Sequence, residues 1–295
     1  MKKQNNSAID RLFYGLVYTI LGFAVICTLY PFIYTLSMSM SSLDAVNRGA
    51  VWLWPVEPTF DGYSIVLQNP QLYTAFQNSL FYTLAGTVLN LAVTCLAAYP
   101  LSRRDFIWRK QLNFFLAFTM YFSGGLIPTY MLLTSMGLYN SRWVMLIPSL
   151  LSTYNVMLLR SAFTDLSAEL VESAQIDGAN DWTILSRLAV PLVKPTLAVL
   201  ALYYAVGHWN DFFTPMIYLG NSSLHPLQLL LRRVLLEASS EMITGKLNER
   251  TLNLAATTIQ VRYVTIVVAT LPILALYPFL QKYFVKGIML GAVKG

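Results

Sequence analysis

The sequence predicts an all-α, polytopic membrane protein with six transmembrane helices. Of its 295 residues, 56% are hydrophobic and only 12% are charged, whereas soluble domains carry about 25% charged residues. The apolar residues form six runs that are each long enough for the ~20 residues of a spanning helix. This composition excludes a disordered chain, and two cysteines, Cys27 and Cys95, are too few for a disulfide framework.

The six expected spans follow the apolar runs. They cover residues 13–36, 79–101, 112–133, 143–163, 196–219 and 263–284, so that a spanning domain of 13–284 lies between a short N-terminus, 1–12, and a tail, 285–295. The first run is about 24 residues long, whereas the apolar part of a cleaved signal peptide has ~7–15. We therefore expect the first run to be a retained anchor.

The distribution of Lys and Arg predicts that both ends of the chain face the cytoplasm. With residues 1–12 inside, thirteen of the 20 cations fall in inside segments and seven in outside segments. The strongest inside marker is Arg103-Arg104-Asp-Phe-Ile-Trp-Arg109-Lys110, because cations in short loops determine orientation. Two long segments, 37–78 and 221–262, then lie outside.

The inside segment 164–195 is unusual because it is acidic. Asp177-Gly178 is a turn signal, and Ser167, Asn180 and Asp181 are residue types that cap helices, so we expect two short helices around a turn. The second helix, 182–188, places Trp182, Leu185 and Leu188 on one apolar face and is expected to end at Pro191. An amphipathic helix with so few cations favours a protein partner over a lipid surface.

A motif with defined spacing occupies this segment. Glu172-Ser-Ala174 is followed after three residues by Gly178, and after nine more by Leu188-Ala-Val-Pro191. The pattern resembles the EAA loop of ABC importer permeases: E-A-A, three residues, G, nine residues, I-x-L-P. Three conservative departures, at Ser173, Leu188 and Val190, do not disturb the spacing.

The resemblance implies a type I ABC importer permease whose loop enters a cleft of a separate ATPase and passes its movement to the membrane helices. On this reading Trp182 and Leu185 are docking anchors. The full set of residues assigned to coupling is Glu172, Ala174, Asp177, Gly178, Trp182, Leu185 and Pro191.

Other motifs resemble the carbohydrate-uptake branch of these permeases. Trp209-Asn210-Asp211-Phe212 with Pro215 is similar to the W-N-x-F-x-x-P pattern of that branch, and 122–130 is similar to LplC-like permeases. The ending Gly291-Ala-Val-Lys294-Gly resembles the MalG-like tail, which implies that Gly291 and Lys294 contact the ATPase. Together they imply import of a sugar or oligosaccharide.

Polar and aromatic residues within the fifth span are candidates for the lining of a translocation path. A carboxylate at membrane depth is costly and usually serves a function. The candidates are Tyr204, Trp209, Asn210 and Asp211. The alternative is helix packing by the aromatic residues and Asn210, with Asp211 at the membrane interface.

Two adjacent cations, Arg232 and Arg233, make the outside segment 221–262 basic. They could form a solvated face paired with nearby glutamates. They could instead steer an acidic oligosaccharide, or dock an acidic binding protein.

No catalytic, metal or nucleotide site is expected in this chain. The only histidines, His208 and His225, fall in a span and an outside loop, and Ser240 stands where a phosphate loop before Lys246 needs its first glycine. We therefore expect a non-enzyme without a cofactor of its own, with ATP and Mg bound by a partner ATPase.

The expected setting is the cytoplasmic (inner) membrane of a bacterium. The resemblance implies a second permease as a heterodimer partner, an ATPase dimer, an extracytoplasmic solute-binding protein and membrane lipid, with no nucleic acid. Two alternatives remain open: an ABC permease for a non-sugar solute, and an ATP-independent membrane transporter, which would leave the acidic segment unexplained.

Overall fold

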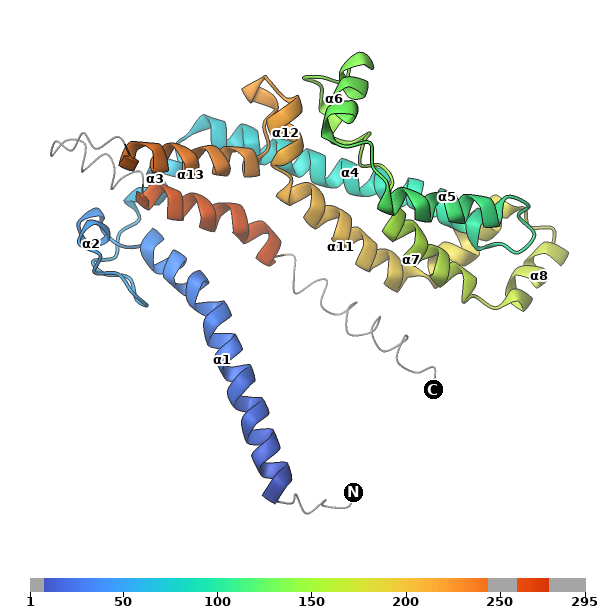
Figure 1. Cartoon of the computed structure of the whole chain (residues 1–295), viewed down its shortest axis with the longest axis horizontal. Coiled ribbons are helices and arrows are strands. Elements are labelled where there is room, and N and C mark those ends of the chain that lie inside the picture. The colour runs from blue at the N-terminus through green and yellow to red at the C-terminus, as the bar shows by residue number, and fades with distance from the viewer. Residues whose placement is uncertain (1–7, 244–258, 276–295) are drawn as a thin grey trace. The chain divides into compact units, whose positions relative to one another are not determined.

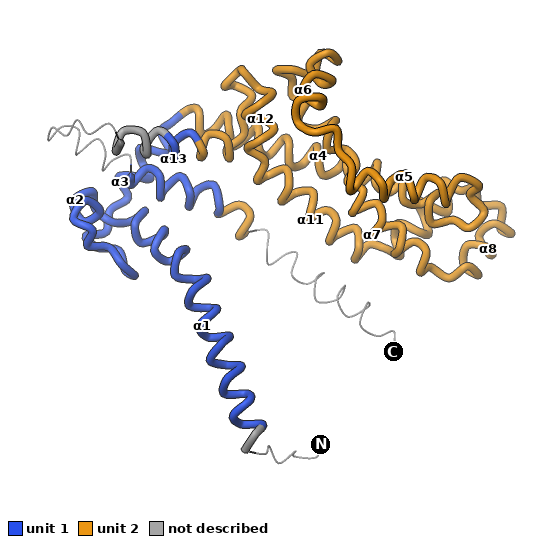
Figure 2. Tube along the Cα trace, viewed as in Figure 1, with its two compact units in different colours: residues 1–69, 233–270 blue, residues 70–232, 271–295 orange. Residues whose placement is uncertain are grey.

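The computed structural model describes residues 8–243 and 259–275, and every regular element in these two ranges is helical (Figure 1). The chain divides into two compact units, coloured separately in Figure 2. Unit 1 consists of Met1–Asn69 and Arg233–Thr270, and unit 2 consists of Pro70–Arg232 and Leu271–Gly295. An all-helical chain is what the composition predicts.

Unit 1 begins with α1, Ala8–Ser39, whose most apolar stretch contains no buried residue. Asp10–Ser39 is long and apolar enough to cross a membrane, and at 1.5 Å per residue it measures about 45 Å. After it come α2, Leu43–Asn47, and α3, Asp61–Leu67. Most of the helix Ile259–Ala275 also belongs to this unit. A helix with an apolar surface all round requires lipid or another protein around it.

A small core joins the end of α1 to the loop that follows it. Met38, Ala45, Val46 and Val51 are buried together, with Tyr263 packed against them. The Ser37 hydroxyl donates to the Leu53 carbonyl (2.7 Å). These contacts hold the 50–56 loop against the last turn of α1.

Unit 2 is built around α4, Pro70–Ser102, the second helix long and apolar enough to cross a membrane. Two other helices, α7 (Thr153–Thr164) and α11 (Lys194–Asn210), pack along it (Figure 1). The Asn90 side chain joins α4 to α11 and to the loop before α7: its amide nitrogen donates to the Ser149 carbonyl, and its oxygen lies 3.0 Å from His208 Nε2. Polar groups buried in this way need such partners.

The predicted span 112–133 is divided into two helices. α5, Arg109–Tyr121, and α6, Leu126–Ser135, are inclined by 114° across a short break. Gly125, in the break, has a φ of 80°, a backbone conformation that glycine adopts without strain. The break therefore has a local cause.

The predicted spans 143–163 and 196–219 are also not continuous helices. The first consists of a 3₁₀ turn, η1 (Arg142–Met145), and α7, separated by a stretch that contains Pro148, a residue without the N–H that a helix needs. In the second, α11 ends at Asn210 and α12 covers Phe213–Tyr218, with Asp211 in an extended conformation between them. The Asp211 carboxylate accepts a hydrogen bond from the Thr214 N–H in the first turn of α12 (3.0 Å).

The predicted span 263–284 is described only in part. The helix Ile259–Ala275 covers its beginning, and its remainder lies outside the described residues. Counted by length and apolar composition, the described residues hold two continuous spanning helices, and up to four if each bent pair is one span.

Candidate coupling site

The predicted first helix of the acidic segment is α8, Ala168–Ile176. Glu169 lies in its first turn, where a carboxylate interacts favourably with the helix dipole. Ser167 stands at the N-cap position, but its hydroxyl forms no capping hydrogen bond, unlike the role that we expected for it.

The turn predicted at Asp177-Gly178 is present. Gly178 has a φ of 81°, in the left-handed region where glycine commonly ends a helix. Its N–H donates to the Gln175 carbonyl (3.0 Å), and the Ala179 N–H donates to the Ala174 carbonyl (2.9 Å). Gly178 therefore reverses the chain directly after α8.

The second helix starts at a predicted cap and is longer than predicted. The Asn180 side chain accepts from the Thr183 N–H (2.8 Å). The helix then continues through α9 (Asp181–Thr183), a π-helical stretch, η2 (Ile184–Ala189), and α10 (Val190–Leu192). It passes Pro191, which we expected to end it, and Pro191 stands in the first turn of α10, where a missing N–H is tolerated. An 83° bend then leads into α11.

Leu185 does not lie where a docking anchor should. Its side chain is only 7% exposed and belongs to a core with Leu159 of α7 and Leu200 of α11. Ala174 packs against the same core. At Leu185 the apolar face of the second helix therefore covers this chain's own core, and the assignment of Leu185 to coupling stays a prediction.

Exposed apolar side chains instead surround the Gly178 turn. Trp182 is 65% exposed, as an anchor should be, and Ile176 at the end of α8 is 86% exposed. The sequence analysis missed Ile176, although its position directly before the Asp177-Gly178 turn was a signal. Asp177 and Pro191 are also exposed.

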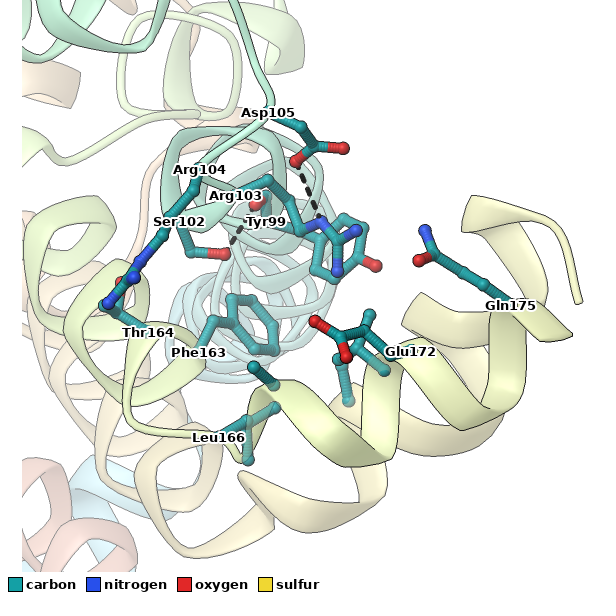
Figure 3. Close-up of a pocket in the computed structure, with 13 residues that line it drawn as sticks. Tyr99, Ser102, Arg103, Arg104, Asp105, Phe163, Thr164, Leu166, Glu172 and Gln175 are labelled. Carbon is teal, nitrogen blue, oxygen red and sulfur yellow. Dashed lines mark hydrogen bonds and ion pairs between the residues drawn. The ribbon is translucent and has the colours of Figure 1, made fainter.

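A pocket of about 500 Å³ separates α8 from the end of α4 and the loop after it. Figure 3 shows the Glu172 carboxylate pointing into it from α8 and the Arg103 guanidinium entering from the opposite wall. Arg103 Nε lies 3.3 Å from Asp105 Oδ1. Gln175 also lines the pocket.

Sequence reasoning used Arg103 only as a marker of orientation. It had no means of placing Arg103 beside Glu172, because the two residues are far apart in the chain. The pocket therefore adds Arg103, Asp105 and Gln175 to the candidate site.

Two of the four candidates for the translocation path are packed inside unit 2. Tyr204 is 7% exposed, and its hydroxyl lies 2.7 Å from the Thr94 hydroxyl of α4. Trp209 is 5% exposed and meets the Phe76 ring edge-on at a centroid distance of 5.9 Å. In this conformation both side chains join α11 to α4 and do not line an open path, since the pairing of the two helices covers them.

The other two path candidates lie at the end of α11. Asn210 is exposed, and Asp211 is partly exposed and accepts a hydrogen bond from the Thr214 N–H. The tail residues Gly291 and Lys294 lie outside the described residues.

Comparison with known proteins identifies the family. A family model described as "Binding-protein-dependent transport system inner membrane component" matches residues 3–290. The chain is 38% identical over 290 residues to the polygalacturonan/rhamnogalacturonan transport system permease protein YtcP of Bacillus subtilis (strain 168), with 98% of this chain and 99% of that protein covered. It is 36% identical over 291 residues to protein LplC of the same organism, with 99% and 98% covered.

A solved structure agrees with this assignment. The fold is similar, with a TM-score of 0.86 and 35% identity, to a chain in the crystal structure of a bacterial ABC transporter involved in the import of the acidic polysaccharide alginate. The match covers 96% of this chain and 100% of that one. The protein therefore belongs to the family of inner-membrane components of binding-protein-dependent transport systems.

Proposed function

We propose that this chain is a permease subunit of an ATP-driven, binding-protein-dependent ABC importer for an acidic oligosaccharide. The observation that carries the proposal is the geometry of the 164–195 segment. Two helices joined by the Gly178 turn present exposed Ile176 and Trp182 beside a pocket into which Glu172 points. Such a projection suits the cleft of a partner subunit.

Coupling in this proposal passes through the second helix. Ile176 and Trp182 dock on the ATPase, and Glu172 offers a charged contact at the edge of the pocket. Buried Leu185 then carries the movement to α7 and α11, because a closely packed core transmits displacement. Leu185 is thus a transmitting residue and Trp182 a docking residue.

A six-span topology with both termini inside is compatible with the helices. Two continuous helices, the bent pair of α5 and α6, and the segment formed by α11 and α12 account for four spans. The η1–α7 segment and the helix beginning at Ile259 account for the other two. Interrupted helices are compatible with membranes where protein or a water-filled cavity surrounds the break.

The remaining subunits supply what this chain lacks. An ATPase dimer binds ATP and Mg and hydrolyses the nucleotide, with Gly291 and Lys294 of the tail at its interface. The exposed apolar surface of α1 leaves room for lipid and a second permease. A solute-binding protein delivers the sugar from outside.

The substrate class rests on two relatives. The YtcP name specifies polygalacturonan and rhamnogalacturonan, and the solved relative is involved in alginate import. Polygalacturonan and alginate are built from sugar acids. The proposal therefore favours an acidic oligosaccharide over a non-sugar solute or an ATP-independent transporter.

The test is to purify the tagged chain in mild detergent, identify the subunits that accompany it, and reconstitute the complex. Vesicles that hold ATP should take up a galacturonate trisaccharide only when the binding protein is present. A chain that purifies alone, or a complex whose uptake is indifferent to ATP, would refute the proposal.

A further inference from the structure

We propose that Arg232 binds a carboxylate of the transported sugar at the break between α11 and α12. The inference rests on the proposed import of an acidic oligosaccharide and adds a residue to it. The contact that carries it joins α13, Leu227–Ile243, to the break: Arg232 Cζ lies 4.5 Å from the centroid of the Phe212 ring. Both residues belong to unit 2.

In the proposed topology, with Lys194 at the cytoplasmic edge of the membrane, the break lies at membrane depth. At 1.5 Å per residue, Asn210 is about 24 Å along α11 from Lys194, within the outer third of a ~30 Å apolar layer. Backbone without helical hydrogen bonds is tolerated at such depth only inside protein or beside a water-filled cavity. Broken helices are also where transporters commonly place their substrate sites.

The side chains at the break favour a position beside a water-filled cavity. Phe212 and Phe213 are exposed, and so is Asn210. A polar amide and two aromatic rings that reach the surface at this depth are suited to a water-filled path that carries a sugar. The Asp211 carboxylate is already engaged, since it accepts from the Thr214 N–H (3.0 Å).

Arg232 lies over an aromatic ring, and among residues 10–236 and 259–275, whose side chains the structure describes, it has no carboxylate partner. The ion pairs among these residues are Arg48–Glu57 and Arg103–Asp105. A guanidinium over a ring retains N–H donors at its edge, and its planar fork matches a carboxylate with two parallel hydrogen bonds. Phe212 therefore presents a cation whose preferred partner is a carboxylate.

Arg142 provides an internal contrast. Its Cζ also lies over a ring, 5.2 Å from the Phe81 centroid, but its Nη2 donates to Asn78 Oδ1 (3.2 Å). Asn78 in turn donates to the carbonyls of Ser223 and His225. Arg142 thus helps to fix the loop before α13, whereas Arg232 is available to a ligand.

The experiment uses the whole complex in proteoliposomes, with ATP inside and a galacturonate trisaccharide at saturating binding protein outside. Arg232→Met removes the charge and keeps an apolar stem over Phe212, and Lys110→Met, at an exposed cation on the predicted cytoplasmic side, is the control for loss of one positive charge. We expect Arg232→Met to lower the uptake rate about tenfold or more, as loss of a charge-assisted bond would. Lys110→Met should stay within about twofold of the wild type.

Three other outcomes would contradict either the role of Arg232 or the proposed function. Equal rates in the two variants would overturn the role of Arg232 while leaving the importer intact. An Arg232→Met chain that no longer purifies with its partner subunits would show that Arg232 serves assembly, and would also overturn it. A wild-type complex that imports no sugar acid with ATP would instead refute the proposed function.

Discussion

Glu172 and Arg103 point toward each other across the pocket between α8 and the end of α4, and Arg103 is meanwhile paired with Asp105 (Figure 3). The acidic motif is thereby placed beside a cation from the preceding cytoplasmic loop. Opposite charges on facing walls attract, and the attraction favours one position of α8 over others. The position of α8 therefore depends on a residue outside the acidic segment.

Arg103→Met should loosen α8. We expect faster hydrogen–deuterium exchange in the 168–176 peptide and a severalfold lower transport rate per ATP hydrolysed. Arg104→Met is the control, because Arg104 lies on the other side of the pocket, beside Thr164 (Figure 3). Identical exchange in the two variants would mean that the Arg103 charge does not position α8.

Gly86→Ala should destabilise unit 2. A Cβ at Gly86 would lie 2.6 Å from Cε1 of His208, whose Nε2 is bonded to Asn90. Overpacking of a core costs about 1–3 kcal/mol, so the melting temperature of the purified complex should fall. Gly207→Ala meets no atom within 4 Å and should not lower it. Unchanged melting in Gly86→Ala would show that α4 and α11 are not closely packed here.

The loop between α2 and α3 should lose stability in acid. The Ser42 hydroxyl and the Arg48 guanidinium hold the pKa of the Glu57 carboxyl below its ordinary value, and Arg48 Nη2 lies 2.9 Å from Glu57 Oε1. Because the folded-state pKa is lowered, the stabilisation is present above the ordinary pKa and is lost as pH falls through the lowered one.

Hydrogen–deuterium exchange of residues 42–57 checks this dependence. At pH 7 the wild type should exchange more slowly than Glu57→Gln, and the difference should shrink as the pH approaches ~3. A difference that persists unchanged in acid would exclude the carboxylate as its cause.

The local chemistry of the coupling segment could be predicted from the sequence. Gly178 adopts the left-handed conformation that ends a helix, and Asn180 caps the next one. Both features depend on residues within a few positions of each other, so spacing and residue type were sufficient.

The inward face of the second helix could not be predicted in the same way. Leu185 and Trp182 both lie on its apolar face, and only the tertiary packing of α7 and α11 decides that Leu185 is buried and Trp182 exposed. The approach of Arg103 to Glu172 is also tertiary. Periodicity predicts which side chains form an apolar face, but not whether that face packs on the chain's own core or stays exposed.

The breaks in the expected spans could not be predicted from hydropathy. At the break between α11 and α12, Asp211 has an extended backbone, and its carboxylate accepts a hydrogen bond from the Thr214 N–H. Gly125 similarly interrupts an apolar run through its backbone conformation. A scale that averages side-chain polarity does not register either cause.

The central claim is that Glu172 couples ATP hydrolysis to transport. The most direct test measures uptake and ATP hydrolysis together in proteoliposomes that contain the complex with Glu172→Lys, with Glu169→Lys as the matched control on the exposed first turn of α8. We expect Glu172→Lys to insert and purify normally, yet to lose at least tenfold in sugar moved per ATP, while Glu169→Lys stays close to the wild type. Normal uptake per ATP in Glu172→Lys would contradict the assignment.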